Sequence, residues 1–324
     1  FLEMRVLFSF VSLSGILASV ETQFADFLKL HGKHYHSKDE YQRRFDVFSS
    51  NLARIQENNH VAASSLRLGL TLFADMDSHE LPRGYKWNSK SEDNIPVSPP
   101  HWQIEAPNSV DWRTKGAVSP IRDQGQGETC WSFSTAGAVE GARVAQAKLP
   151  FAALSNQYLI DCMNIPCANS SGTMDDAFKW ISTQNAGQLY SWKTYPYIDA
   201  DCIFWDPPHP CQHNDTLVPG ADVVGLHHTI PANETDLMLA VAVQPVSVAI
   251  YSSAASFGVY KDGVYEDDAC KNVTPQMLDH AVLVVGYGTT AAGQDYWMVK
   301  NSWGTKWGIE GYFMLARNKG NMCG

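Results

Sequence analysis

The chain has 324 residues and a formal net charge of −10, from 24 basic and 34 acidic side chains. This length is enough for about two domains of ~100–200 residues each. An apolar fraction of 44% with 18% charged residues excludes a wholly disordered chain. The acidic balance argues against a nucleic-acid or anionic-membrane surface, since both need clustered Lys and Arg. No apolar run reaches the ~20 residues of a membrane-spanning helix, so none is expected.

The first 20 residues have the pattern of a secretory signal peptide. Met4 and Arg5 precede an apolar run over residues 6–17, and the small residues Ala18 and Ser19 follow it. A basic start, a short apolar core and a small-residue cleavage region are typical of such signals, although a buried helix would also be apolar. We therefore expect residues 1–20 to be a signal peptide.

Cysteine number and glycosylation motifs also fit a secreted chain. Seven cysteines are an odd number, which predicts three disulfides and one free thiol. Four Asn-x-Ser/Thr motifs offer glycosylation sites in a secreted protein. These motifs begin at Asn169, Asn214, Asn233 and Asn272.

Along the chain, residues 21 to about 80 read as charged and mostly helical. Residues 88–107 are rich in Ser, Pro, Asp and Glu, which predicts an exposed linker that proteases cut easily. Helical patterns follow at 130–144 and 173–181, and β-branched and aromatic runs dominate from about residue 221. The runs expected as strands are 246–251, 281–288, 296–304 and 311–317. A helical half followed by a β half predicts an α+β fold of two lobes with a cleft between them.

One cysteine stands where a helix is expected to begin. Cys130 follows a Gly-rich turn and opens an apolar helical segment. A helix N-terminus favours an anion, so a thiol there is acidified toward the nucleophilic thiolate. Taken alone, such a cysteine could equally be a small buried hydrophobe.

Three further residues supply what a cysteine nucleophile needs. His280 stands at the start of a strand-like run, and Asn301 follows another strand. An imidazole beside the thiol acts as its base, and an amide such as Asn301 holds the ring, while Trp303 shields that hydrogen bond. Gln124, six residues before Cys130, can donate to an oxyanion beside the cysteine's own N–H.

The N-terminal region contains a stripe of mixed residues. Successive spacings of four, four, three, four and four place six residues on one face of a helix. The first two are spaced for an i,i+4 ion pair. An ordinary amphipathic helix has the same period, so only the residue types are informative. The six residues are Glu40, Arg44, Phe48, Asn51, Ile55 and Asn59, and Gly69, Thr71, Phe73 and Asp75 follow at alternate positions.

Taken together, these motifs resemble those of the papain family of cysteine endopeptidases, in the cathepsin L-like branch. The stripe is similar to the Glu–Arg–Phe–Asn–Ile–Asn signature of the inhibitory propeptides, and the likeness runs from about Phe24 to Gly324. It implies a preproenzyme with a papain-like two-lobe α+β fold. Residues 21–103 would be the propeptide and linker, and residues 104–324 the peptidase domain.

The resemblance also implies a mechanism and partners. Cys130 would be the nucleophile, His280 the acid and base, Asn301 the residue that orients it and Gln124 the oxyanion donor, in peptide hydrolysis through a thioester. No cofactor or metal is implied. Expected partners are peptide substrates, the chain's own propeptide and cystatin-like inhibitors, for a monomer without nucleic-acid or membrane partners. The expected location is a lysosome or another acidic compartment, or outside the cell.

Substrate binding follows from the same likeness. Gly172 would offer its backbone to an extended substrate, with Trp303 and Glu128 also beside the cleft. An apolar pocket would take the second residue before the scissile bond. Its walls would be Thr173, Met174, Ala249 and Leu278, although Ala249 could simply fill core. Family members continue past the position of Gly324, into residues that form the floor of this pocket.

Two departures from the family pattern leave alternatives open. Gly127-Glu128-Thr129 stands where relatives have Cys-Gly-Ser, and the loop that begins at Cys167 is altered and carries Asn169. A weakly active or inactive homologue that acts as a binding protein is the alternative to an enzyme, and the retained catalytic set argues against it. We expect the Glu128 carboxylate to favour Arg or Lys just before the scissile bond. Alternatively, this side chain points into solvent or narrows the cleft.

Disulfides and activation complete the expectations. The resemblance implies two bridges: Cys270 with Cys323, and Cys162 with Cys202. Gly127 removes the usual partner of Cys167, so we expect Cys167 to pair with Cys211, the alternative being two free thiols. We also expect self-processing within residues 88–107 at acidic pH, when carboxylates such as Asp75 or Glu40 become protonated.

Overall fold

The computed structural model describes most of the chain. The described residues are 13–61, 64–88, 95–96, 105–165, 171–184, 187–199, 209–212, 217–218, 223 and 225–324. Within them, no helix combines the length and the apolar character that crossing a membrane requires. The helices of this part are α1 (Leu13–His31), α2 (Lys38–His60), α3 (Cys130–Ala145), α4 (Gln157–Cys162), α5 (Met174–Gln184) and α6 (Glu234–Val243).

The strands form one large sheet and one short pair. They are β1 (Arg67–Leu68), β2 (Val110–Asp111), β3 (Val246–Ile250), β4 (Tyr260–Asp262), β5 (Val264–Tyr265), β6 (His280–Thr289), β7 (Asp295–Lys300) and β8 (Tyr312–Ala316). The large sheet has the order β2-β6-β7-β8-β5, with β3 also paired to β6. All its pairs are antiparallel except β5 with β8. Strand β6 is buried over nearly its whole length, which explains its unbroken apolar run.

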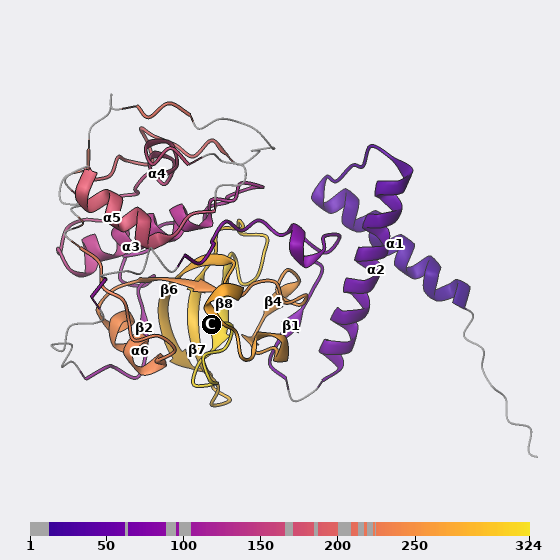
Figure 1. The fold of residues 1–324 in the computed structure, drawn as a ribbon. Helices are drawn as coiled ribbons and strands as arrows, with labels where there is room; N and C mark the ends of the chain where they lie inside the picture. The colour runs from indigo at the N-terminus through magenta and orange to yellow at the C-terminus, as the bar shows by residue number, and fades with distance from the viewer. Residues whose placement is uncertain are drawn as a thin grey trace, which may run out of the picture.

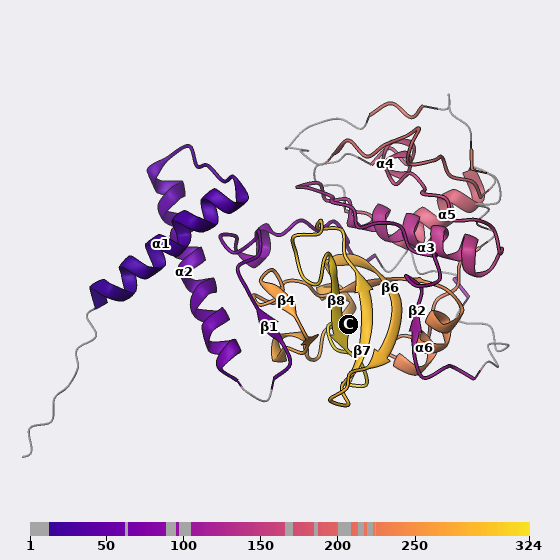
Figure 2. The same cartoon turned by 180° about the vertical axis from the view of Figure 1, so that it is seen from behind.

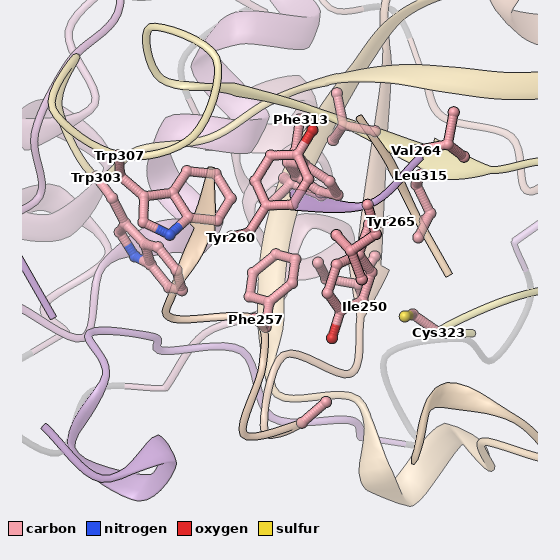
Figure 3. Packing of buried hydrophobic residues seen from close by; sticks show 14 of the residues in the cluster. Ile250, Phe257, Tyr260, Val264, Tyr265, Trp303, Trp307, Phe313, Leu315 and Cys323 are labelled. Atoms are coloured by element: carbon pink, nitrogen blue, oxygen red, sulfur yellow. The ribbon is translucent and has the colours of Figure 1, made fainter. Parts of the chain in front are cut away.

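The α+β fold has two lobes, one mainly helical and one built on the large sheet (Figure 1). Each lobe has a buried apolar cluster. Trp131, Tyr158 and Ile181 are buried in one cluster with residues of α3, α4 and α5. The other cluster fills the β lobe, where the rings of Phe257 and Trp307 are 5.2 Å apart (Figure 3), and continues into α1 and α2 through Phe24 and Phe48. Helix α3 approaches the sheet closely, because a Cβ at Gly137 would come within 2.9 Å of Leu283. The two lobes therefore meet along the α3–β6 contact, where the cleft begins.

Helices α1 and α2 stand to one side of both lobes (Figures 1 and 2). Their contact is aromatic: the ring of Phe24 lies 5.0 Å from Phe48, and Phe27 lies 5.1 Å from the same ring. After α2 the chain pairs as β1 with β4 of the β lobe. It then runs across the molecule toward α3, so the helical pair is tied to the segment that enters the cleft.

The residues of the α2 stripe hold this segment. Phe48, Asn51 and Ile55 are buried. Asn51 Nδ2 donates to the backbone carbonyl of residue 74 at 2.9 Å, and Asn59 exchanges two hydrogen bonds with the backbone of Leu68 at 2.9 and 3.1 Å. The stripe thus fixes the backbone that follows α2. Amides suit this role because they both donate and accept.

The spacing predicted an ion pair between Glu40 and Arg44, and the partner of Arg44 is wrong in that prediction. Arg44 Nη1 contacts Glu80 Oε2 at 2.9 Å, on a short 3₁₀ helix (Ser78–Glu80), rather than Glu40 one turn before it. It also donates to the backbone carbonyl of Asp75 at 3.1 Å. The i,i+4 spacing permits the local pair, but the chain that packs on α2 offers a carboxylate in a more buried place.

Helix α6 lies in the half that was expected to be mainly β. Asn233 caps it, accepting hydrogen bonds from the N–H groups of Thr235 and Asp236 at 3.1 Å. The sequence contains a signal for this helix, since Asn followed by acidic residues is typical of a helix N-terminus. The four expected strand runs correspond to β3, β6, β7 and β8, and the two expected helices to α3 and α5.

The expected cysteine pairing needs correction. Cys162 forms a disulfide with Cys211, at a Cα–Cα distance of 4.6 Å, so neither the Cys162–Cys202 nor the Cys167–Cys211 pair forms. Tyr195 lies between the two segments that this bridge joins. Its hydroxyl donates to Asp161, beside Cys162, at 2.6 Å and accepts from the N–H after Cys211 at 3.5 Å, so the packing around this ring is consistent with the pair that forms. The structure does form the Cys270–Cys323 bridge that the resemblance implies.

Several expectations fall outside the described residues. These are Cys167, Cys202, Asn169 and Asn214, the first 12 residues of the expected signal peptide, and most of the 88–107 linker. Asn233 and Asn272 are described, and both are exposed.

Candidate active site

The nucleophile candidate is buried at the start of a helix. Cys130 is the first residue of α3, has no exposed surface, and is free of any disulfide. Its Sγ accepts a hydrogen bond from the N–H of Ala281 at 3.2 Å. Burial raises the pKa of the Cys130 thiol to about 12, although the Ala281 N–H acts to lower it. In this form burial therefore opposes the acidification expected from the helix position, because the neighbouring chain excludes water from the sulfur.

The base candidate lies at the first residue of β6. His280 Nε2 donates to Asn301 Oδ1 at 2.8 Å, and an amide oxygen can only accept, so this nitrogen carries the proton. The Trp303 ring stacks on the imidazole, with centroids 4.8 Å apart. Nδ1 of His280 is buried and has no hydrogen-bond partner among the described residues. Burial lowers the pKa of His280 to about 4, so the ring is neutral and its open nitrogen can accept a proton.

The two candidate oxyanion donors both contact one carbonyl of the propeptide. Gln124 Nε2 donates to the backbone carbonyl of Arg83 at 2.9 Å, and the N–H of Cys130 donates to the same oxygen at 3.5 Å. Ser302 Oγ donates to Gln124 Oε1 at 2.6 Å and fixes the amide. These two donors therefore converge on one peptide oxygen, as an oxyanion hole requires.

The segment from Arg83 to Tyr85 occupies the cleft, which sequence reasoning missed. The N–H of Gly172 donates to the carbonyl of Gly84 at 2.9 Å, and Tyr85 forms a parallel bridge with Gly172. Gly84 is required here, because its φ is +131° and a Cβ would lie 1.9 Å from the carbonyl oxygen of Glu128. The only sequence signal was a glycine shortly after the Gly69–Asp75 motif.

The expected pocket residues fall into two groups. Met174 opens α5, and Ala249 is paired with Ala281 across β3 and β6. Tyr85 and Ala249 both pack against the apolar cluster that contains Met174, so a propeptide residue joins the core on this side of the cleft. Thr173 is buried beside Met174, whereas Leu278 is half-buried and faces the chain end, where a Cβ at Gly324 would lie 2.4 Å from it.

Two residues that the sequence did not mark support the site. The Tyr197 hydroxyl donates to the carbonyl of Gln124 at 2.8 Å and lies 2.8 Å from Thr129 Oγ1. A Cβ at Gly127 would come within 2.7 Å of this hydroxyl, so Tyr197 takes the space that a side chain at this position would need. Asp279, the residue before His280, is the second and binds Arg83 at 3.1 Å. Glu128 is half-buried at this edge of the cleft.

Comparison with known proteins agrees with this geometry. Residues 106–324 match the papain family cysteine protease model, and residues 24–81 match the cathepsin propeptide inhibitor domain (I29). Cathepsin L of Sarcophaga peregrina is 38% identical over 313 residues, covering 91% of this chain and 87% of the relative. Cathepsin K of Mus musculus is also 38% identical, covering 94% of this chain and 91% of the relative.

A solved proenzyme has the same arrangement of both parts. The digestive procathepsin L2 proteinase from Tenebrio molitor larval midgut superposes with a TM-score of 0.78 at 33% identity, covering 94% of this chain and 96% of that one. The two family matches include Cys130, His280, all of α2 and the second part of α1. The chain therefore belongs to the papain family of cysteine proteases and is a cysteine endopeptidase with an N-terminal inhibitory propeptide.

Proposed function

We propose that the chain is an inactive proenzyme that matures at acidic pH and then hydrolyses peptide bonds through a thioester on Cys130. His280 Nδ1 would take the thiol proton, and the sulfur would attack the substrate carbonyl. Gln124 and the N–H of Cys130 would stabilise the oxyanion, and the imidazolium would then protonate the leaving amine. Water would release the acyl group in the second step. The proposal draws on one observation above all: the two donors converge on the carbonyl oxygen of Arg83.

The direction of the propeptide explains why it inhibits rather than reacts. Trp303 Nε1 donates to the carbonyl of Pro82 at 2.8 Å, and Trp303 covers His280. On the other side, Gly172 donates to the carbonyl of Gly84. The amide nitrogen that would have to leave belongs to Gly84 and so lies away from the imidazole. A productive substrate needs its leaving nitrogen beside His280, and therefore runs in the opposite direction.

Acid would loosen the propeptide by removing charges that hold it. Asp75 is almost wholly buried and is bonded by Lys33 and Tyr35. Glu80 binds Arg43 and Arg44, each at 2.9 Å. Protonation of Glu80, whose pKa these contacts lower, removes the attraction of Arg43 and Arg44 and so weakens the fold of the propeptide that fills the cleft.

The proposed boundaries follow the expectations from sequence. We assign residues 1–20 to a signal peptide, 21–103 to the propeptide and linker, and 104–324 to the peptidase. The family matches at 24–81 and 106–324 support the last two. Dependence on acid suits a lysosome or a similar acidic compartment, or secretion into an acidic fluid, where the substrates would be proteins and peptides.

A fluorogenic assay tests the proposal. The purified proenzyme is incubated at acidic pH with a thiol reductant and a dipeptide substrate that has Leu or Phe at the second position before the scissile bond. We expect hydrolysis that develops as the propeptide is removed, and a loss of about 10²–10³ in kcat for Gln124→Ala. A folded, processed protein that hydrolyses no peptide would instead support the alternative of an inactive homologue that acts as a binding protein.

A further inference from the structure

A guanidinium group is bound beside the nucleophile by residues of the peptidase domain. Arg83 Nη1 donates to Ser253 Oγ at 2.6 Å and to Asp279 Oδ2 at 3.1 Å. Ser253 Oγ in turn donates to Asp279 Oδ2 at 2.6 Å. The N–H and hydroxyl of Ser252 donate to Asp279 Oδ1 at 2.7 and 2.8 Å. Every oxygen of the carboxylate is thus held in place, and the site is preorganised for a cation.

Its position along the substrate follows from the direction of the propeptide. The carbonyl of Arg83 lies in the proposed oxyanion hole. On the side of His280, the propeptide continues toward its N-terminus, through Pro82. Arg83 Cα therefore stands where the leaving nitrogen of a substrate would stand. The first residue after the scissile bond begins one bond further on, so its long side chain can reach the carboxylate of Asp279.

Removal of the propeptide leaves this site without its cation. Among the described residues, Arg83 is the cation that pairs with Asp279. Even with Arg83 bound, 22% of the Asp279 side-chain surface stays exposed. Arg83 itself is held imperfectly, because its Nε and Nη2 are buried without hydrogen-bond partners. The side chain of a substrate that runs in the forward direction starts from a different backbone position. It could therefore offer more of its N–H groups to this site than Arg83 does.

We propose that Asp279, Ser252 and Ser253 form a binding site for Arg or Lys at the first substrate position after the scissile bond. The proposal rests on the proposed function, because it assumes that peptides are cleaved in this cleft. It names a substrate class that the apolar pocket does not determine: peptides with an apolar residue two positions before the bond and a basic residue directly after it. The expected preference is about five-fold, as for a partly exposed ion pair with charge-assisted hydrogen bonds.

The test compares four internally quenched peptides that differ only at this position. They carry Arg, Lys, citrulline or Ala, with Leu at the second position before the bond, and mass spectrometry verifies which bond is cut. We expect kcat/KM for Arg to exceed that for citrulline, its neutral near-isostere, by about five-fold, with Lys also above Ala. The ratio should fall at high salt, because the carboxylate is partly exposed.

Variants identify the residues that carry the preference. Ser253→Ala and Asp279→Asn should each bring the Arg-to-citrulline ratio toward one. The ratio is the readout because Asp279 adjoins His280, and any general loss of rate cancels between the two peptides. Asp268→Asn removes an exposed carboxylate outside the cleft and should leave the ratio at its wild-type value.

The outcomes separate the two proposals. If the mature enzyme cleaves all four peptides at the intended bond with equal kcat/KM, the basic subsite is wrong and the peptidase function stands. A preference that survives in Asp279→Asn would overturn it as well. If no peptide is cleaved by the matured wild type, the proposed function itself fails.

Discussion

Burial controls the protonation of both reacting side chains in the proenzyme. It raises the pKa of Cys130 to about 12 and lowers that of His280 to about 4, so the thiol and the imidazole are both neutral near pH 7. A thiolate–imidazolium pair has to form before the sulfur can attack. The propeptide therefore acts against the proposed reaction in two ways: the Arg83 carbonyl takes up the two proposed oxyanion donors, and the propeptide excludes the water that would stabilise the charged pair.

This double effect predicts a large change in thiol reactivity on maturation. Because the thiolate is the nucleophile, alkylation of Cys130 by iodoacetamide at pH 7 should be at least about ten-fold slower in the proenzyme than after propeptide removal. Mass spectrometry of the peptide that contains Cys130 measures each rate. Equal rates in the two forms would mean that the propeptide does not control the ionisation of the thiol.

Glu128 should influence which residue precedes the scissile bond. Glu128 is half-buried and its backbone carbonyl faces Gly84 in the cleft, and the attraction of a carboxylate there to a substrate cation is on the order of 1 kcal/mol. We expect Arg to be favoured over Gln at that substrate position by about five-fold, and Glu128→Gly to abolish this preference. Glu128→Gln keeps the size of the side chain and separates charge from steric narrowing. An Arg-to-Gln ratio of kcat/KM that is the same in all three proteins would exclude a role in specificity.

At the scale of elements, α2 acts as a support for the chain that enters the cleft. Its amides fix the backbone around residues 68 and 74, and Arg44 binds Glu80. Burial acts to raise the pKa of Glu80, but hydrogen bonds from Arg43 and from the N–H of Asp77, with the charge of Arg44, outweigh it and lower that pKa. The folded propeptide is thereby stabilised at pH values above the ordinary carboxyl pKa of 4.5, and this contribution is lost as the pH falls through the lowered value.

Replacing the Glu80 carboxylate should destabilise the proenzyme only at pH values at which this carboxylate is ionised. In a Cys130→Ala background, which prevents self-cleavage, Glu80→Gln should lower Tm at pH 7 by about 2–4 °C, as expected for a loss of about 1 kcal/mol. The difference should shrink as the pH falls below about 4. Glu57→Gln, a change at an exposed position of α2, is the control. A Tm difference that is unchanged at low pH would show that the charge of Glu80 is not involved.

Helices and strands with a strong period were predictable, whereas contacts between distant segments were not. The apolar run of β6 and the pattern of α3 are local properties, and so is the identity of Cys130, His280 and Asn301 as candidates. The partner of Arg44 is set by a segment 36 residues later, which no spacing rule reveals. The same holds for the insertion of Arg83 into the cleft, because it depends on where β1 pairs and on how α2 is placed.

At the scale of the whole molecule, cross-links and packing fix the two lobes. The Cys162–Cys211 bridge spans 49 residues of the α lobe, and the Cys270–Cys323 bridge spans 53 residues of the β lobe. Each closes a long loop and restricts the unfolded chain. The first pairing was mispredicted because it depends on packing between distant segments, which is invisible in the sequence.

Non-reduced peptide mapping checks this pairing. We expect one linked peptide that joins Cys162 to Cys211, and we expect Cys211→Ser to cost about 2–4 kcal/mol of unfolding free energy. Urea denaturation of the Cys130→Ala proenzyme, with and without the second change, measures that cost. A linked peptide that joins Cys162 to Cys202 would contradict the structure.

The central claim is that Cys130 makes this chain a peptidase that the propeptide restrains until acid releases it. The most direct measurement follows maturation of purified proenzyme at pH 4 by gel electrophoresis and N-terminal sequencing, for the wild type and Cys130→Ala. The account predicts that the wild type is cut within residues 88–107, and that the variant stays intact alone but is cut when mature wild type is added. A variant that matures by itself at the wild-type rate would contradict it.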